Sequence, residues 1–72
     1  MVPRIPALSY REVDALLRRH GFAVLRQRGS HVHYAHPDGR RTTVPRHGRD
    51  VPSGLVAAIL KDAGIDLDEV RR

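Results

Sequence analysis

The stretch FAVLRQRGSHVHYAHPDGRRTTVP, residues 22–45, decides the fold of this 72-residue chain. It contains three short runs rich in Val, Thr, Tyr and Phe, at residues 22–28, 31–36 and 40–45. Gly29-Ser30 separates the first two runs, and Pro37-Asp38-Gly39 separates the last two. Proline presets φ and glycine accepts positive φ, so such separators favour turns. The stretch therefore predicts three antiparallel strands in two consecutive hairpins.

Side chains alternate between the two faces of each predicted strand. One face receives Val32, Tyr34, Thr42 and Val44. The other face receives His31, His33, Ala35, Arg41 and Thr43. The first strand is ambiguous, because Phe22 and Val24 pointing inward would leave Leu25 partly exposed. The position of Tyr34 favours the core, although stacking on a nucleic-acid base is an alternative.

Helical signals flank the strands. Ser9 and Glu12 form a capping box that predicts a helix over residues 10–20. Gly21 is placed to end this helix in a left-handed conformation, with Phe22 folding back on it. A second helix is predicted over residues 53–63, with Gly64 as its C-cap and an apolar stripe of Leu55, Val56, Ile59, Leu60 and Ala63.

The two ends of the chain have weaker signals. Residues 66–69 predict a last short helical turn that carries Leu67 and Val70. Residues 1–8 contain Pro3 and Pro6 and show no periodicity, so we expect a loose N-terminal arm.

The predicted order is α-β-β-β-α in a single domain over residues 1–72. Three strands with one apolar face and two amphipathic helices predict an α+β two-layer sandwich, with both helices on the same face of a three-stranded antiparallel sheet. The uncovered face of the sheet would display His31, His33, Arg41 and Thr43. Such a face is either a binding surface or merely solvated.

The composition narrows the function. The chain has no cysteine, which excludes disulfides and Cys-based zinc sites. It has no apolar run near the roughly 20 residues that a membrane helix needs and no apparent signal peptide, so we expect a soluble cytoplasmic protein that binds no membrane.

The charge of the chain favours a particular class of partner. Thirteen Lys and Arg against eight Asp and Glu leave a net charge of +5. Eight arginines and all five histidines lie between Arg18 and Arg49, where Asp38 is the single acid. Arginine binds phosphate bidentately and stacks on bases, which favours a nucleic-acid partner.

The segment from the first helix to the end of the second resembles the HicA family of toxin ribonucleases. The matching pieces occur in order: Gly21-Phe22, Arg26-Gln27-Arg28-Gly29-Ser30-His31, Tyr34, Val44-Pro45-Arg46-His47 and Ile59-Leu60-Lys61-Asp62-Ala63-Gly64-Ile65. The resemblance implies the double-stranded-RNA-binding-domain-like fold, which agrees with the order predicted above. It also implies an endoribonuclease that cleaves mRNA without a metal or other cofactor and stops translation and growth. The implied partner is a HicB-type antitoxin that covers the active face, and the implied catalytic histidine is His31, in the Gly-Ser-His element.

Histidine suits this chemistry, because cleavage of RNA without metal needs a base for the 2′-OH proton and an acid for the leaving oxygen. Imidazole in water titrates near neutral pH and can serve as either group. Gly29 and Ser30 would let the backbone approach phosphate, with their N–H groups stabilising developing charge. One histidine cannot easily be base and acid at once, so the second role is left open between His33, an arginine and water.

The remaining histidines and the arginines have weaker assignments. His33 is a candidate for RNA binding or proton transfer; a zinc site shared with His31 is disfavoured because no third ligand is evident. His47 is a candidate for contact with phosphate or with the antitoxin, whereas His20 and His36 are interpreted as structural or solvent residues. Phosphate contacts are expected from about half of a cluster near His31 that comprises Arg26, Arg28, Arg40, Arg41, Arg46 and Arg49. We expect RNA binding by Arg26, Arg28, Gly29, Ser30, His33, Arg41, Arg46 and His47.

A different class of function fits the same pattern. A non-catalytic RNA-binding module would use the same fold through shape and phosphate contacts. Turnover separates the two hypotheses, because the module binds RNA and leaves it intact.

Overall fold

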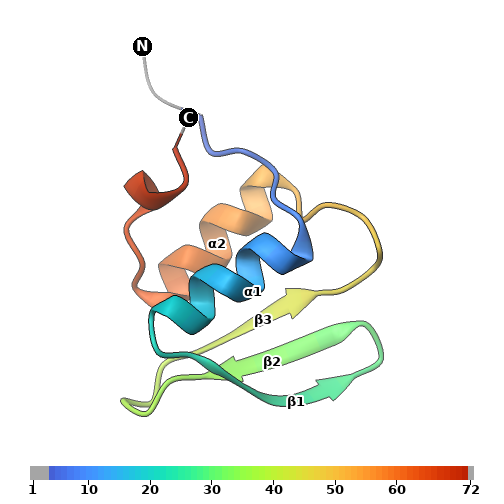
Figure 1. Ribbon diagram of the computed structural model, residues 1–72, viewed down its shortest axis with the longest axis vertical. Helices are drawn as coiled ribbons and strands as arrows, with labels where there is room; N and C mark the ends of the chain where they lie inside the picture. Colours follow the sequence, from blue (N-terminus) through green and yellow to red (C-terminus); the bar gives the residue numbers. More distant parts are fainter. Residues whose placement is uncertain (1–3, 72) are drawn as a thin grey trace.

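A computed structural model describes residues 4–71 of the chain. The elements follow the order α1 (Tyr10–Arg19), β1 (Ala23–Arg28), β2 (His31–Ala35), β3 (Arg41–Pro45), α2 (Ser53–Ala63) and a short 3-10 helix, η1 (Leu67–Glu69). The predicted α-β-β-β-α order is confirmed, and each boundary lies within a residue of its predicted position. Figure 1 shows both helices on the same side of the sheet, with β3 nearest to them and β1 farthest away.

The sheet is antiparallel and has the order β1-β2-β3. Val32 pairs with Val44 and Tyr34 with Thr42, and these four side chains are buried against the helices. The predicted inner face of β2 and β3 is therefore confirmed. His31 and Arg41 are exposed on the opposite face, which we call the outer face of the sheet.

The predicted caps of α1 are present. Glu12 N–H donates to the Ser9 hydroxyl, at 3.1 Å between the two heavy atoms, and the Ser9 hydroxyl donates to the Glu12 carboxylate. Gly21 has φ +89°, and Phe22 N–H donates back to the Leu17 carbonyl. These bonds satisfy backbone groups that a helix end leaves unpaired and bury Phe22 against the helix.

Strand β1 differs from the buried strands. Val24 lies opposite Tyr34 and so faces inward, yet it is 40% exposed, and Leu25 is 49% exposed. The register shifts between Val24 and Arg26, where Leu25 forms a bulge. The exposure of Leu25 agrees with the alternative in which Phe22 and Val24 point inward. Val24 is only partly covered, because both helices pack against β3 and leave the inner side of this edge strand open.

Helix α2 confirms all but one residue of its predicted apolar stripe. Val56, Ile59, Leu60 and Ala63 are buried, whereas Leu55 is 38% exposed. Assignment of Leu55 to the core is wrong, because its position in the first turn places it beside the loop at residues 46–52 instead of under the sheet.

The segment before α1 is more ordered at its end than expected. Leu8 is 3% exposed and forms an antiparallel bridge with Val51, with backbone N–H to O bonds in both directions. Ile5 packs against the core. The expectation of a loose arm over residues 1–8 is therefore wrong at Leu8, because this apolar side chain fills the core beside α1; residues 1–3 lie outside the described part.

The C-terminal turn forms as predicted. Gly64 ends α2 with φ +68°, and the Asp66 carboxylate accepts from Asp68 N–H at the start of η1. Val70 is buried and Leu67 packs against the core.

Tyr34 belongs to the core, and its hydroxyl is tied to α1. It donates to the Asp14 carboxylate at 2.6 Å and shares a hydrogen bond with the Tyr10 hydroxyl. Arg18 holds the same carboxylate through two bonds of 3.0 Å. Burial, followed by the bond to Asp14, raises the pKa of Tyr34 well above its usual range, so the phenol stays protonated and keeps donating. Core packing is confirmed, since the ring has no exposed surface for a base.

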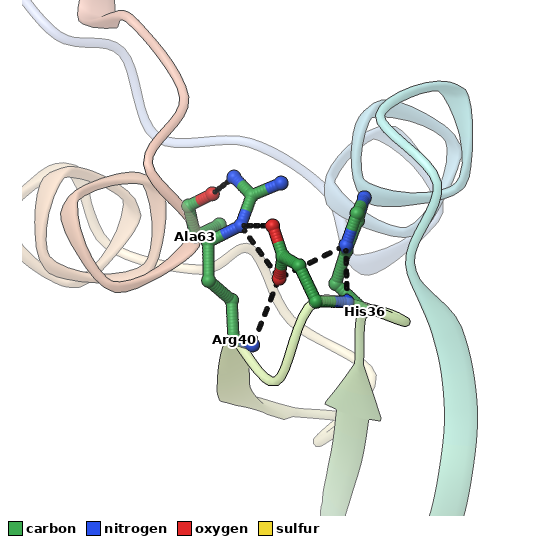
Figure 2. A network of polar contacts seen from close by, with 4 residues as sticks. His36, Arg40 and Ala63 are labelled. Atoms are coloured by element: carbon green, nitrogen blue, oxygen red, sulfur yellow. Dashed lines mark hydrogen bonds and ion pairs between the residues drawn. The ribbon is translucent and has the colours of Figure 1, made fainter.

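A polar network joins the β2–β3 turn to the end of α2 (Figure 2). Arg40 bonds the Asp38 carboxylate at 2.8 Å and donates to the Ala63 carbonyl. Its guanidinium also lies over the Phe22 ring, 5.3 Å from the centroid. The expected place of Arg40 near His31 is wrong, because Arg40 lies at the opposite end of the β2–β3 hairpin, where it caps a helix.

Neither α1 nor α2 is long and apolar enough to cross a bilayer, and the same holds for every helix of residues 4–71.

Candidate nucleic-acid interface and catalytic site

The outer face of the sheet gathers basic side chains from all three strands. Arg28 lies opposite His31 and Arg26 opposite His33, and directly opposed residues of antiparallel strands point to the same face. Thr43 lies opposite His33 on the other side. The outer face therefore carries five of the candidate residues together with their neighbour Thr43. The five are Arg26, Arg28, His31, His33 and Arg41.

His31 is the first residue of β2 and follows a two-residue turn. Gly29 occupies the left-handed region with φ +57°, as a tight turn between antiparallel strands requires. The Gln27 amide donates to the Gly29 carbonyl, and Arg46 N–H donates to the Ser30 carbonyl. The turn is thus held from both sides, and it presents the exposed His31 ring at the end of the sheet.

A cleft of about 560 Å³ opens beside His31 at the β3 edge of the sheet. The outer face supplies His31, Thr43 and Pro45. The loop after β3 supplies His47, Arg49 and Asp50, and Leu55 lines the cleft from α2. The size suits part of a nucleotide, because ligand pockets typically measure about 300–1,000 Å³.

His47 lies next to His31 in this cleft. The two ring centroids are 6.3 Å apart and the ring planes are inclined at 80°. The two rings come from separate elements sixteen positions apart, and the bond between Arg46 N–H and the Ser30 carbonyl joins their backbones.

His33 is oriented by its neighbour on β3. Its Nδ1 lies 3.0 Å from the Thr43 hydroxyl, so one ring nitrogen is engaged within the sheet. The ring is half-buried and stays on the outer face, two residues from His31.

Of the two roles left open for His20 and His36, structural or solvent, the contacts of both rings support the structural one. His20 Nε2 lies 2.7 Å from the Glu69 carboxylate, which ties the end of α1 to η1. His36 packs edge-on against Phe22 and bonds the Asp38 carboxylate and backbone. Neither ring faces the cleft.

Arg46 stands apart from the other predicted RNA-binding arginines. Its guanidinium lies over the Tyr10 ring, 4.9 Å from the centroid, on the helix side of the loop. Arg41 is on the outer face, but it pairs with Ala35 at the end of the sheet far from His31. Contact of either residue with RNA stays a prediction.

Sequence reasoning missed three features of the cleft. It did not place His47 beside His31, because the path of a loop has no periodic signal. It did not assign Asp50 to the site, and it placed Leu55 in the core. A cue for Leu55 is its position one residue ahead of the buried set at 56, 59, 60 and 63, at the edge of the apolar stripe.

Among residues 4–71, no three His, Asp or Glu side chains gather closely enough to form a metal-binding group.

Comparison with known protein families gives a match over most of the chain. A family model described as HicA toxin of bacterial toxin-antitoxin matches residues 10–65. These residues run from the first residue of α1 to the residue after the Gly64 cap, and so include the whole sheet, the cleft and α2. A search of curated proteins finds no match for the chain.

Proposed function

This chain belongs to the HicA family of bacterial toxins, and we propose that it is an endoribonuclease that cleaves mRNA without a metal ion. Cleavage of mRNA in the cytoplasm would stop translation and growth.

The exposed ring of His31 carries this proposal. It lies on a surface that also displays Arg26 and Arg28, at the mouth of a cleft large enough for part of a nucleotide. No hydrogen bond or ion pair within residues 4–71 engages its ring nitrogens. An imidazole that is exposed, uncommitted and surrounded by phosphate-binding cations is suited to proton transfer on an RNA backbone.

The chemistry that we propose uses the RNA's own hydroxyl as the nucleophile. His31 accepts the 2′-OH proton as the 2′ oxygen attacks the adjacent phosphorus. The N–H groups of Gly29 and Ser30 approach the phosphate as negative charge develops on it. A proton donor then supplies the leaving 5′ oxygen.

Binding of the RNA strand is assigned to the outer face. Arg26, Arg28, Arg41 and His33 point to the same side as His31, and cations spaced along a sheet can follow a phosphate backbone. His47 and Arg49, in the loop after β3, line the cleft beside this face, whereas Arg46 lies on the helix side of that loop. Such binding weakens as salt rises, because each neutralised phosphate releases counterions.

A HicB-type antitoxin is the proposed protein partner. Membership in a toxin–antitoxin family supports an antitoxin, and the excess of arginine around His31 favours an acidic surface on it. By covering the outer face, such a partner would exclude RNA from the cleft.

Cleavage of RNA in excess EDTA tests the proposal. We expect the purified protein to cut mRNA, and the His31→Ala variant to lose at least about 100-fold in rate, since a positioned proton-transfer group contributes about 10²–10⁴-fold. His20→Ala is the matched control, because it removes a histidine that contacts Glu69 instead of the cleft.

The other outcomes are also decisive. If the parent and His31→Ala both bind RNA and leave it intact, the protein is an RNA-binding module and the nuclease proposal is wrong. Equal cleavage by the parent and His31→Ala would remove His31 from the mechanism.

A further inference from the structure

The contacts of the five histidines divide them into two groups. Three have a ring nitrogen engaged by the protein: His20 by Glu69, His33 by Thr43 and His36 by Asp38. The other two, His31 and His47, have no hydrogen bond or ion pair within residues 4–71.

The two unengaged rings lie in the same cleft. Their centroids are 6.3 Å apart, at an inclination of 80°, and both residues are exposed. Hydrogen bonds span about 2.6–3.2 Å between heavy atoms, so one phosphate group between the rings reaches both after small side-chain rotations. The bond from Arg46 N–H to the Ser30 carbonyl keeps the backbones next to the two histidines together.

We propose that His47 is the second proton-transfer residue, so that His31 and His47 form a two-histidine pair that cleaves RNA. This inference rests on the proposed nuclease function and identifies the proton donor that the resemblance and the sequence leave open.

The step balances as a transesterification. Neutral His31 removes the 2′-OH proton, the bond between the 2′ oxygen and phosphorus forms, and the bond between phosphorus and the 5′ oxygen breaks. Protonated His47 gives its proton to the departing 5′ oxygen. The products are a 2′,3′-cyclic phosphate and a 5′-hydroxyl, and proton exchange with water restores both rings.

The charged neighbours of the two rings differ. Arg28 lies opposite His31 on the sheet, whereas Asp50 lines the cleft with His47 and Arg49. A base must be neutral before it acts and an acid must be protonated. We assign His31, opposite Arg28, as the base and His47, in the loop that carries Arg46, Arg49 and Asp50, as the acid. The second test below decides this order.

The first test compares His47→Asn with His20→Asn, which makes the same chemical change outside the cleft. We expect His47→Asn to lose at least about 100-fold in the single-turnover cleavage rate, with unchanged thermal unfolding and a far smaller loss of RNA affinity, whereas His20→Asn cleaves like the parent. Full activity of His47→Asn would overturn the inference. A parent that leaves RNA intact would overturn the proposed function along with it, whereas a cleaving parent with an equally active His47→Asn overturns the inference alone.

The second test separates a proton donor from a residue that only holds the substrate. In an RNA whose scissile 5′ oxygen is replaced by sulfur, the thiolate leaves without a donated proton. We expect this substrate to restore most of the rate of His47→Asn and none of the rate of His31→Ala. Rescue of His31→Ala instead, or of neither variant, would overturn the assignment of His47 as the acid.

The pH profile gives an independent readout. The parent should show a bell-shaped dependence of rate on pH, because one group must be neutral and the other protonated. His47→Asn should lose the fall in rate at high pH and keep the fall at low pH. A profile that keeps both limbs would contradict the role of His47.

Discussion

At the scale of single residues, the contacts of each ring separate the histidines that we propose act on RNA from those that hold the fold together. Period-two alternation places both His31 and His33 on the outer face, and the residue order cannot distinguish them further. The distinction comes from Thr43, which engages His33 and has no counterpart at His31, where Pro45 is the opposite residue on β3. Proline offers no side-chain hydrogen bond, so the His31 ring stays available.

Arg28 is expected to act through phosphate. In a His31→Ala background, where RNA is not consumed, Arg28→Ala should weaken RNA binding similarly for all sequences. It should also lower the slope of log affinity against log salt by about 0.7, the value for one phosphate contact to a single strand. Fluorescence titrations at several salt concentrations measure both quantities.

Arg11→Ala is the control for Arg28→Ala, because it removes the same charge from the exposed side of α1, on the helix layer of the molecule. An equal change of slope in both variants would show that net charge governs binding instead of the outer face.

The buried hydroxyl of Thr42 lowers the stability of the fold. Its hydroxyl has no hydrogen-bond partner within residues 4–71, and it faces the helices opposite Tyr34. Thr42→Val replaces this hydroxyl with a methyl group, so we expect the free energy of unfolding to rise by about 1 kcal/mol. For a domain of this size, that gain raises Tm by about 4–8 °C.

Thr43→Val is the comparison for Thr42→Val, because it loses the bond to His33 on the outer face and should give no such gain. A Tm for Thr42→Val at or below that of the parent would show that the hydroxyl is satisfied in solution.

At the scale of elements, local signals predicted the helix and strand boundaries well, because caps and turns act over a few residues. Ser9, Gly21 and Gly64 each satisfy or redirect backbone groups at a helix end, whatever the rest of the chain does. The error at Leu55 and the ambiguity at Val24 have a different origin. Both depend on which part of a neighbouring element covers them, and that information is absent from the segment itself.

The stability that the β2–β3 turn contributes should decrease in acid. Backbone and side-chain bonds from Arg40 lower the pKa of Asp38, so its folded pKa lies below the value of about 3.9 for an unfolded aspartate. When the pKa of a carboxyl is lower in the folded state, the stability it adds is fully present above the pKa of the unfolded state. That stability is lost as the pH falls through the pKa of the folded state. As the pH is lowered below about 4, we expect the urea concentration at the unfolding midpoint to fall more steeply for the parent than for Asp38→Asn.

Asp62→Asn, at an exposed position of α2, provides the reference for this acid response. If Asp38→Asn retains the pH dependence of the parent while Asp62→Asn loses it, the turn is not the acid-sensitive element.

At the scale of the whole molecule, the apolar core and the proposed RNA-binding surface lie on opposite faces of the sheet. The helices and the inner face of the sheet supply the apolar core, and the outer face of the sheet has no helix over it among the described residues. Binary patterning of β2 and β3 was enough to predict this division and to place His31, His33 and Arg41 on the same surface. The cleft was not predictable, because it arises where the end of the sheet, the loop at residues 46–52 and α2 meet in space.

The chemical identity of the cleaved RNA ends tests the central claim most directly. Cleavage by the parent in excess EDTA should give fragments with 2′,3′-cyclic phosphate and 5′-hydroxyl ends, and His31→Ala should give neither. Such ends arise only if the 2′-OH attacks, which is the step that His31 starts. Fragments with 5′-phosphate ends, or cyclic phosphate formed at the parental rate by His31→Ala, would contradict the account.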